Sequence, residues 1–493
     1  MLKYVSTKGE TSPVDFETAV LRGFADDGGL FVPQEIPRVS KDQLEKWSTL
    51  SFDNLAFELL SLYIDRSIIP ETDLKDLIRK STQPFNHPEI LPVIPLGKDS
   101  NHFIMELFHG PTLSFKDVAM GFLINTMDYF LTCKNETVSL LIATTGDTGP
   151  AAAYASCGKK TVDTWVLYPR GFISEAQERQ MTTLGAPNVH AVCVENCPSG
   201  GDDLDLVIGQ LFADKKLVEK RRLSSVNSIN WCRVMYQMVH YFHAYFKIAD
   251  NIEDKIAFSV PTGAFGNLFA GYLAREMGLP VVALICANNS NATVHRVLET
   301  GTFSQKSLKQ TPSNAIDIAL PYNYWRFLYY ISGQDGKAIQ GWMNQYDEKG
   351  EVRFDESMME RIKQGFLSAA ISGEETLSTI SDTYDMCDGY LLDPHGAVAV
   401  AAAEKLMPDL CANTKVVSLL TAHPSKFPDI TRRALNIDGK LPPSGLHDSI
   451  ERVKDHFQQV NLCDCSKLKA ALIHGMNVLE STTPRLKTEG LER

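Results

Sequence analysis

From about residue 96 to residue 430, short apolar runs alternate with helical stretches, and Gly or Pro follows the runs. Runs of this length, rich in Val, Ile and Leu, are typical of buried parallel strands. Strands that alternate with helices predict an α/β protein with open, mostly parallel sheets and helices on both faces. Because ligands bind at the carboxyl ends of such strands, a functional site is expected in the turns that follow them. The predicted strands cover residues 138–143, 164–168, 189–194, 256–260, 281–286 and 416–420.

The same pattern divides the chain into three parts. Residues 1–95 combine loop signals with helical patterns and few β-branched runs, which predicts a small, mainly helical N-terminal domain. Residues 96–430 form the predicted core, with a subdomain at about 130–210. After a linker at 441–445, two helical stretches predict a C-terminal helical segment and tail, so that the last part covers 431–493.

The composition argues for a small-molecule substrate. A formal net charge of −12 over 493 residues is unlike that of a protein that binds nucleic acid or an anionic membrane. The first 17 residues lack the apolar core of a signal peptide and are too acidic for a transit peptide, which predicts a cytoplasmic protein. No apolar run approaches the roughly 18 residues that span a bilayer. The ten cysteines are scattered without a CxxC pair, so no metal site is predicted.

The turn after the predicted strand 256–260 has the properties of a phosphate site. It reads PTGAFGN over 261–267 and leads into a helical run. Gly263 and Gly266 let the backbone approach an anion closely, and free N–H groups at a helix N-terminus attract phosphate. The turn is neither a GxGxxG fingerprint nor a Walker loop, which disfavours a dinucleotide or a nucleoside triphosphate. A βα turn without a ligand is the alternative.

A second turn, TTGDTG over 144–149, lies between an apolar strand and an Ala-rich helix. Its hydroxyl groups and the N–H groups at the helix start suit a carboxylate or a phosphate of a substrate. Asp147 has a second interpretation, because Asp is a favoured helix N-cap. The sequence leaves both open.

Lys116 is the candidate nucleophile. It lies in HGPTLSFKD over 109–117, among apolar residues that would desolvate its ammonium group and lower its pKa. A lysine of this kind can form a Schiff base. The alternative is a solvated surface lysine that precedes Asp117.

A fourth candidate turn, TAHPSKF over 421–427, ends the predicted strand 416–420. The hydroxyl group of Thr421 could bond a ligand nitrogen there, and Lys426 could meet an anion. An ordinary strand exit is the alternative. The sequence has no GxSxG elbow, which gives a serine hydrolase little support.

Together and in this order, these motifs resemble the threonine synthases of the fold-type-II pyridoxal-phosphate (PLP) family, in their longer class. The resemblance covers nearly the whole chain. Besides the turns described above, it includes YVSTKG at 4–9, GFADDGGLFVP at 23–33, ERQMTTL at 178–184 and NSINWCRV at 227–234.

The resemblance implies roles for individual residues. Lys116 would be the lysine that binds PLP as a Schiff base, and the hydroxyl group of Thr421 would face the pyridine nitrogen. The cofactor phosphate would be held by Gly263, Ala264, Phe265, Gly266 and Asn267. Family members often have Asn where this chain has Ala264, which removes a polar side chain from the phosphate turn but leaves its N–H groups. The substrate would be bound by Thr144, Thr145, Gly146, Asp147 and Thr148, with Asn230, Arg233 and Lys426 as further candidates.

The implied reaction converts O-phospho-L-homoserine and water into L-threonine and phosphate, with Lys116 as the base and PLP as the electron sink. Because water must enter late, the subdomain at 130–210 is expected to close over the substrate. A phospho-lyase that releases 2-oxobutyrate, ammonia and phosphate from the same or a related phospho-amino acid is the alternative. A non-catalytic protein that retained the fold is a third hypothesis. The expected protein is a monomer or a homodimer.

Overall fold

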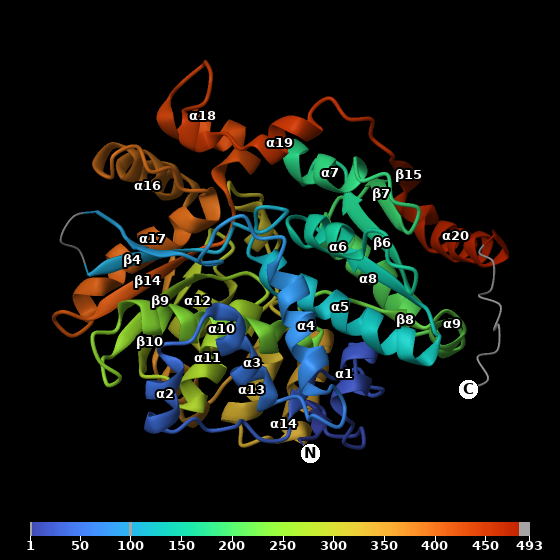
Figure 1. Cartoon of the computed structure of the whole chain (residues 1–493), viewed down its shortest axis with the longest axis horizontal. Helices are drawn as coiled ribbons and strands as arrows, with labels where there is room; N and C mark the ends of the chain where they lie inside the picture. Colours follow the sequence, from blue (N-terminus) through green and yellow to red (C-terminus); the bar gives the residue numbers. More distant parts are fainter. Residues whose placement is uncertain (1, 98–100, 483–493) are drawn as a thin grey trace.

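Two open sheets form the centre of the computed structural model, which describes residues 2–97 and 101–482 (Figure 1). The larger sheet is parallel except for the antiparallel edge strand β3. Its order is β13 (Phe366–Ala370), β10 (Val281–Asn288), β9 (Ile256–Pro261), β14 (Lys415–Leu420), β4 (His102–Glu106) and β3 (Val93–Pro95). The smaller sheet is parallel throughout. Its order is β15 (Asn461–Asp464), β7 (Val189–Glu195), β6 (Val162–Pro169), β5 (Val138–Ala143) and β8 (Leu223–Ser224).

All six predicted strands are confirmed. They become β5, β6, β7, β9, β10 and β14. Their residues are nearly all buried, because helices cover both faces of each sheet, and this explains why the strands are continuously apolar rather than alternating. The smaller sheet corresponds to the predicted subdomain at 130–210 but also takes in β8 and the C-terminal strand β15. Closure of this subdomain stays a prediction.

The N-terminal part is mainly helical, as predicted. It also contains a short antiparallel pair, β1 (Tyr4–Ser6) and β2 (Phe31–Pro33). Its helices are α1 (Phe16–Arg22), α2 (Lys41–Trp47), α3 (Phe52–Ser61) and α4 (Glu71–Thr82). In Figure 1 three of these helices lie in the lower part of the molecule, and α4 reaches up toward the middle beside α5 (Lys116–Lys134).

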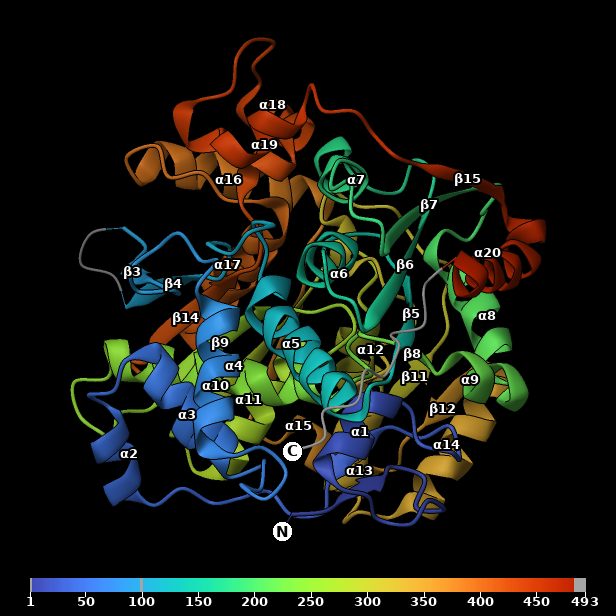
Figure 2. The ribbon, with the colours of Figure 1, turned by 45° about the vertical axis from the view of Figure 1, so that its right-hand side comes forward.

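Most of the helices around the smaller sheet alternate with its strands in the chain, and α5 precedes the first of these strands. They are α5, α6 (Thr148–Ser156), α7 (Glu175–Thr182), α8 (Gly201–Phe212) and α9 (Lys215–Arg221). Helices α6 and α8 both pack on β5 and β6. Figure 2 shows β15 and the terminal helix α20 (Leu468–Thr482) beside β7 and α8, so the C-terminal segment completes this sheet. The rest of the predicted tail, 483–493, lies outside the described residues.

Helix α10 (Trp231–Ile248) is the most buried helix of the core. It is apolar or aromatic on nearly all sides, and it packs against α3, α5 and α11 (Gly266–Met277), as expected for a helix without a solvent face. The remaining helices of the core are α12 (Thr293–Thr300), α13 (Tyr324–Ile331), α14 (Gly336–Lys349), α15 (Glu356–Lys363), α16 (Gly373–Met386) and α17 (Pro394–Leu406). They are followed by α18 (Pro428–Leu435) and α19 (Asp448–Val453), and β11 (Thr302–Ser304) pairs with β12 (Glu351–Arg353). Among the described residues, no helix is both long and apolar enough to cross a membrane.

Candidate active site

A cavity of about 1750 Å³ lies where the carboxyl ends of β5, β9 and β14 meet. The turns after these three strands line it, although they are far apart in the chain. Thr144–Thr148 follow β5, Thr262–Asn267 follow β9, and Thr421 follows β14. Lys116, the first residue of α5, lines the same cavity. The fold therefore brings together the four turns that the sequence indicated separately.

The turn that carries Lys116 is fastened to the turn after β14. The N–H of Phe115 donates to the carbonyl oxygen of Thr421 at 2.8 Å, and the N–H of His423 donates to the carbonyl oxygen of Leu113 at 3.0 Å. Two backbone hydrogen bonds in opposite directions fix the distance between Lys116 and Thr421. The two residues therefore face one cavity because their backbones are joined.

Asp117 braces the same turn from inside. Its carboxylate accepts hydrogen bonds from the N–H of Thr112 at 2.9 Å and from the Thr112 hydroxyl group at 2.6 Å. Burial raises the pKa of Asp117 to about 6, against these hydrogen bonds. Gly110 leaves room for it, since a Cβ at this position would lie 2.5 Å from the Asp117 Cβ. A solvated lysine followed by a solvated aspartate is therefore the wrong interpretation of this segment.

The surroundings of Lys116 favour the neutral form of its amine. Burial, assisted by the positive charge of Arg233 and opposed by Asp147, lowers its pKa to about 7. Its Nζ lies 4.3 Å from the centre of the Phe115 ring. A substantial fraction of the amine is thus unprotonated near neutral pH, and an unprotonated amine can act as a nucleophile or as a base.

The pH dependence of Lys116 labelling follows from this pKa. In the cofactor-free protein, acylation of Lys116 by acetic anhydride should rise with pH and level off above about pH 8, because a lysine is unprotonated above its pKa. Mass spectrometry of digests labelled at several pH values measures this midpoint. Exposed lysines in the same digest serve as the reference, and their labelling should still be rising at about pH 9. A Lys116 midpoint as high as theirs would contradict the prediction.

The turn after β9 forms a cup of free N–H groups at the start of α11. Within the described chain, the N–H groups of Gly263, Ala264 and Phe265 donate to no residue. Phe265 has a left-handed backbone with φ of 64°, which costs a non-glycine residue roughly 1–2 kcal/mol. Its ring is held 5.1 Å from that of Tyr324, so packing maintains this conformation. Asn267 lines the cup, and its Nδ2 is buried without a partner. These donors fit a phosphate group.

A short segment around the 3₁₀ turn Asn314–Ile316 crosses both glycine-bearing turns. A Cβ on Gly263 would lie 2.9 Å from the Ile316 Cα, and a Cβ on Gly146 would lie 2.6 Å from the Ala315 Cβ. Both glycines are therefore required for close approach of this segment. His395 fixes the segment as well, because its Nε2 accepts a hydrogen bond from the N–H of Ala315 at 3.1 Å.

Comparisons with known proteins match successive parts of the chain to the same kind of enzyme. Residues 3–82 match the family model "Threonine synthase N terminus", residues 90–340 match "Pyridoxal-phosphate dependent enzyme", and residues 396–471 match "Threonine synthase, C-terminal". The chain is 37% identical to a threonine synthase of Schizosaccharomyces pombe, over 88% of this chain and 90% of that protein. It belongs to the threonine synthase family. The threonine synthase-like 2 protein of Homo sapiens is also 37% identical, over 86% of this chain and 88% of the other.

Solved structures of this family have the same fold. The structure of threonine synthase from yeast superposes with a TM-score of 0.90 at 35% identity and covers 97% of this chain and 99% of its own. A PLP-bound threonine synthase from Brucella melitensis gives a TM-score of 0.87 at 36% identity, with 96% and 99% covered. The chain is therefore a fold-type-II PLP enzyme with the N-terminal domain of threonine synthases.

In this threonine synthase family member, the loop after β5 is braced from behind. The Thr144 hydroxyl oxygen accepts from the N–H groups of Gly146 at 3.1 Å and Gly149 at 3.2 Å, so this side chain holds the loop in shape. Asp147 makes no side-chain cap hydrogen bond. Its carboxylate is instead 2.5 Å from the Nζ of Lys426 and accepts from Gln177 at 3.0 Å. Neither sequence interpretation of Asp147, helix cap or substrate ligand, anticipates this buried ion pair.

Two predicted substrate contacts, Asn230 and Lys426, lie outside the cavity lining. Asn230 caps α10, accepting from the N–H of Cys232 at 3.2 Å and donating to the carbonyl oxygen of Val20 at 2.8 Å. Lys426 is fully buried, and besides Asp147 it contacts the carbonyl oxygen of Thr112 at 2.8 Å. Both residues hold the site in place through these contacts, and their direct contact with the substrate stays a prediction.

Loss of the Lys426 ammonium group should destabilise the protein strongly. Lys426→Met leaves Asp147 buried and unpaired, which typically costs about 3–5 kcal/mol. The pair Lys405 and Glu375 is half-exposed, so Lys405→Met is the control and should cost less than about 1 kcal/mol. Urea unfolding midpoints compare the variants. The double variant Lys426→Met/Asp147→Asn should recover much of the loss, and no recovery would exclude the unpaired charge as the cause.

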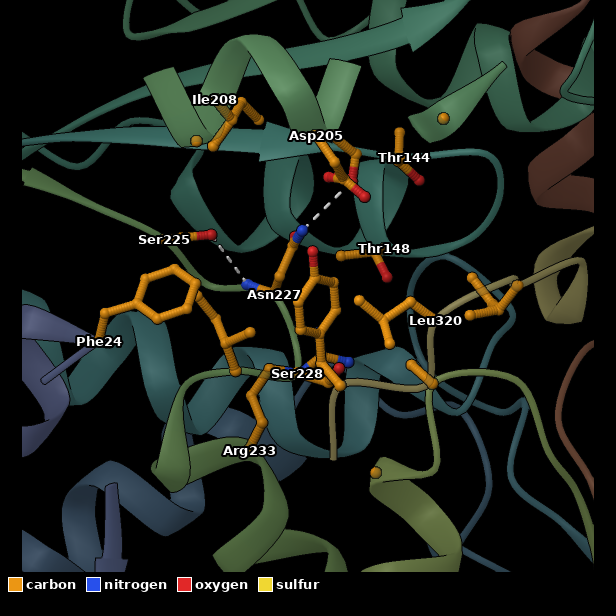
Figure 3. A pocket seen from close by; sticks show the side chains of 18 of the residues that line it. Phe24, Thr144, Thr148, Asp205, Ile208, Ser225, Asn227, Ser228, Arg233 and Leu320 are labelled. Atoms are coloured by element: carbon orange, nitrogen blue, oxygen red, sulfur yellow. Dashed lines mark hydrogen bonds between the residues drawn. The ribbon is translucent and has the colours of Figure 1, made fainter. Parts of the chain in front are cut away.

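Among the predicted site residues, Arg233 has two buried hydrogen-bond donor groups without a partner in the described chain. It is buried at the edge of the cavity, and only its Nη1 is paired, with the carbonyl oxygen of Val226 at 3.1 Å. Its Nε and Nη2 are buried without partners in the described chain. Burial lowers its pKa to about 10, so it keeps its charge at neutral pH. Figure 3 shows Arg233 across the cavity from Thr144 and Thr148.

Many residues of the lining were not predicted from the sequence, and three polar ones bear on the site. Asn227 and Ser228 belong to the quoted NSINWCRV motif and precede Arg233 on the way into α10 (Figure 3). His395 is the third, and its Nδ1 lies 2.7 Å from the Asp393 Oδ1. The motif itself was the available signal for the first two. No local pattern marks His395, because the segment that it holds is distant in sequence.

Proposed function

We propose that this protein converts O-phospho-L-homoserine and water into L-threonine and inorganic phosphate with PLP as cofactor. One observation carries the proposal: the cavity that holds Lys116 and the phosphate cup also contains a second, unneutralised anion-binding group, Arg233. The cup accounts for the cofactor phosphate, so Arg233 is free for a phosphate on the substrate. Guanidinium groups suit this task because their fork binds two phosphate oxygens.

The site fits PLP at each of its parts. Lys116 would supply the amine that links the cofactor, and the cup of Gly263, Ala264 and Phe265 would supply N–H groups to its phosphate. Ala264 contributes no polar side-chain atom, so the backbone and Asn267 supply the donors. Thr421 lines the same cavity and would bring a neutral hydroxyl group to the pyridine nitrogen. When bound, PLP supplies an electron sink for negative charge that develops on the substrate carbons.

Different residues of the site then have different roles in the reaction. Thr145, Thr148 and the N-terminus of α6 receive the substrate carboxylate, while Arg233 orients the phosphate. Lys116, with its lowered pKa, takes the proton from Cα and returns it later. Loss of a proton from Cβ accompanies the breaking of the bond between Cγ and the phosphate oxygen. Cγ then gains one proton to become a methyl group. Water adds its hydroxyl group to Cβ, and its second proton passes to the released phosphate. The products are threonine and phosphate.

A phospho-lyase is the second candidate. Proteins named threonine synthase-like 2 are as similar to this chain as the synthases are, with 38% identity for the Xenopus laevis protein and 39% for the Saccharomyces cerevisiae threonine synthase. A lyase would need the same lysine and the same phosphate cup.

The product assay distinguishes the two. Purified holoenzyme is incubated with O-phospho-L-homoserine, and threonine, 2-oxobutyrate and ammonia are quantified against the phosphate released. Threonine equal to phosphate is expected. Mainly 2-oxobutyrate with matching ammonia would refute the synthase and establish the lyase. A protein that binds PLP but releases no phosphate would support the non-catalytic hypothesis.

A further inference from the structure

Two buried polar side chains of α10 converge on Asn267 from below the cup. The Tyr241 hydroxyl group donates to Asn267 at 2.8 Å from the backbone carbonyl oxygen and 3.0 Å from Oδ1. The His240 Nε2 lies 2.9 Å from the same Oδ1. All three residues are buried, and only Asn267 lines the cavity. The side of the amide that faces the protein is therefore fully occupied.

These contacts determine which way the amide points. Burial lowers the pKa of His240 to about 3, so its ring is neutral and carries one proton. With that proton on Nε2, His240 donates to Oδ1, while the single hydroxyl proton of Tyr241 is shared between Oδ1 at 3.0 Å and the backbone carbonyl oxygen of Asn267 at 2.8 Å. The Nδ2 group of Asn267 is then left without a protein partner. Because Asn267 lines the cup, this group is the side-chain donor available to an anion bound there.

The opposite orientation would be unfavourable for an anion. It would place the amide oxygen of Asn267 beside the phosphate and leave no side-chain donor in the cup, because Ala264 has none. Burying an N–H donor without a partner is also costly, and a phosphate oxygen would satisfy it.

We propose that His240 and Tyr241 are positioning residues that hold the Asn267 amide with its nitrogen toward the cofactor phosphate. The inference rests on the proposed role of Asn267 in the cup and extends it to residues that touch neither cofactor nor substrate. The family comparisons assign neither residue a role.

The packing around Tyr241 supports this role. Its ring lies 5.0 Å from that of Phe258 on β9, the strand that leads into the cup. Gly271 on α11 leaves space for the ring, because a Cβ there would lie 2.7 Å from the Tyr241 Cε1. The strand before the cup and the helix after it thus both fix the hydroxyl group. Its hydrogen bonds to Asn267 are a result of rigid packing.

The test measures cofactor binding in the absence of substrate. Apoproteins are titrated with PLP to obtain Kd, and ³¹P NMR of each loaded protein reports the environment of the phosphate. His240→Phe and Tyr241→Phe should each weaken PLP binding by about tenfold to a hundredfold, the effect of losing one hydrogen bond to a charged group. Both should also shift the phosphorus resonance. His240→Gln, which keeps a donor, should restore much of the affinity.

A matched control lies on the same helix. His243 is also a buried histidine of α10, but its Nε2 contacts the carbonyl oxygen of Leu91 at 3.0 Å, away from the cup. His243→Phe should leave the PLP Kd and the phosphorus resonance unchanged. If it weakens PLP binding as much as His240→Phe, the effect is structural and the proposal fails.

A double-variant cycle tests whether His240 affects PLP binding through the Asn267 amide. In an Asn267→Ala background, His240→Phe should cause no further loss of PLP affinity, because the amide that it positions is absent. Additive losses would overturn the proposal. Should His240→Phe fail to fold, Tyr241→Phe answers the same question, since it removes a single oxygen. Substrate is absent throughout, so a negative result here leaves the proposed reaction standing, and a failed product assay leaves this inference standing.

Discussion

Lys116→Ala should lower turnover of O-phospho-L-homoserine by more than about a thousandfold, because a positioned acid–base group alone contributes about 10²–10⁴-fold. This lysine is placed to link the cofactor and to move the substrate proton, so its loss removes both functions. The side chain lines the cavity, and burial lowers its pKa to about 7. Steady-state kinetics and the visible absorbance of the loaded protein measure the two functions separately.

The control for Lys116 lies at the other end of the same helix. Lys134 in the last turn of α5 is half-exposed and paired with Glu17, so Lys134→Ala should keep near wild-type turnover. Added methylamine should partly restore turnover to Lys116→Ala, because a small amine can replace the missing base. A Lys116→Ala protein that retains a tenth of wild-type activity would show that another group takes the proton.

Arg233→Met should lower kcat/KM for the phosphorylated substrate by about 10²–10⁴-fold. Each hydrogen bond to a charged group contributes about 1.5–3 kcal/mol, and Arg233 has two unpaired donor groups, Nε and Nη2. Arg233→Lys should lie between Met and wild type, since lysine keeps the charge but lacks the planar fork. Inhibition by inorganic phosphate should weaken in parallel.

The affinity for PLP decides which phosphate Arg233 serves. If it binds the substrate phosphate, the PLP Kd of Arg233→Met should stay close to that of wild type. A PLP Kd that rises as much as kcat/KM falls would instead assign Arg233 to the cofactor cup. Arg275→Met is the control, because Arg275 contacts the carbonyl oxygen of Gln364 away from the cavity.

The strands show how far local pattern determines the fold. Six apolar runs predicted six strands correctly because their burial is encoded in their own residues. The strand β15 gave no such signal, since NLCD at 461–464 has no β-branched run and none of its residues is fully buried. It is a strand because it pairs with the edge of β7, more than two hundred residues earlier in the chain. Edge pairing is a property of the tertiary structure.

The NSINWCRV motif at 227–234 also shows both what local sequence predicts and what only the tertiary structure decides. Asn230 and Arg233 are three residues apart, and the sequence favours both as substrate contacts. Their roles differ because α10 starts at Trp231. Asn230, the residue before the helix, caps it, whereas Arg233, inside the first turn, lines the cavity. Asp147 is similar, since its partner Lys426 comes from a strand exit far along the chain.

The sequence by itself determined the α/β class, the order of the turns and the residue types of the site, because glycine, hydroxyl and lysine side chains have local chemical consequences. Through ordered motifs it also determined the family. The tertiary structure alone decided which of these residues share a cavity. It brought the charges of Arg233 and Asp147 near Lys116, turned Asn230 and Lys426 into supports, and placed His240 and Tyr241 against Asn267. Burial, charge pairing and hydrogen-bond geometry depend on neighbours from distant segments, and no local pattern contains them.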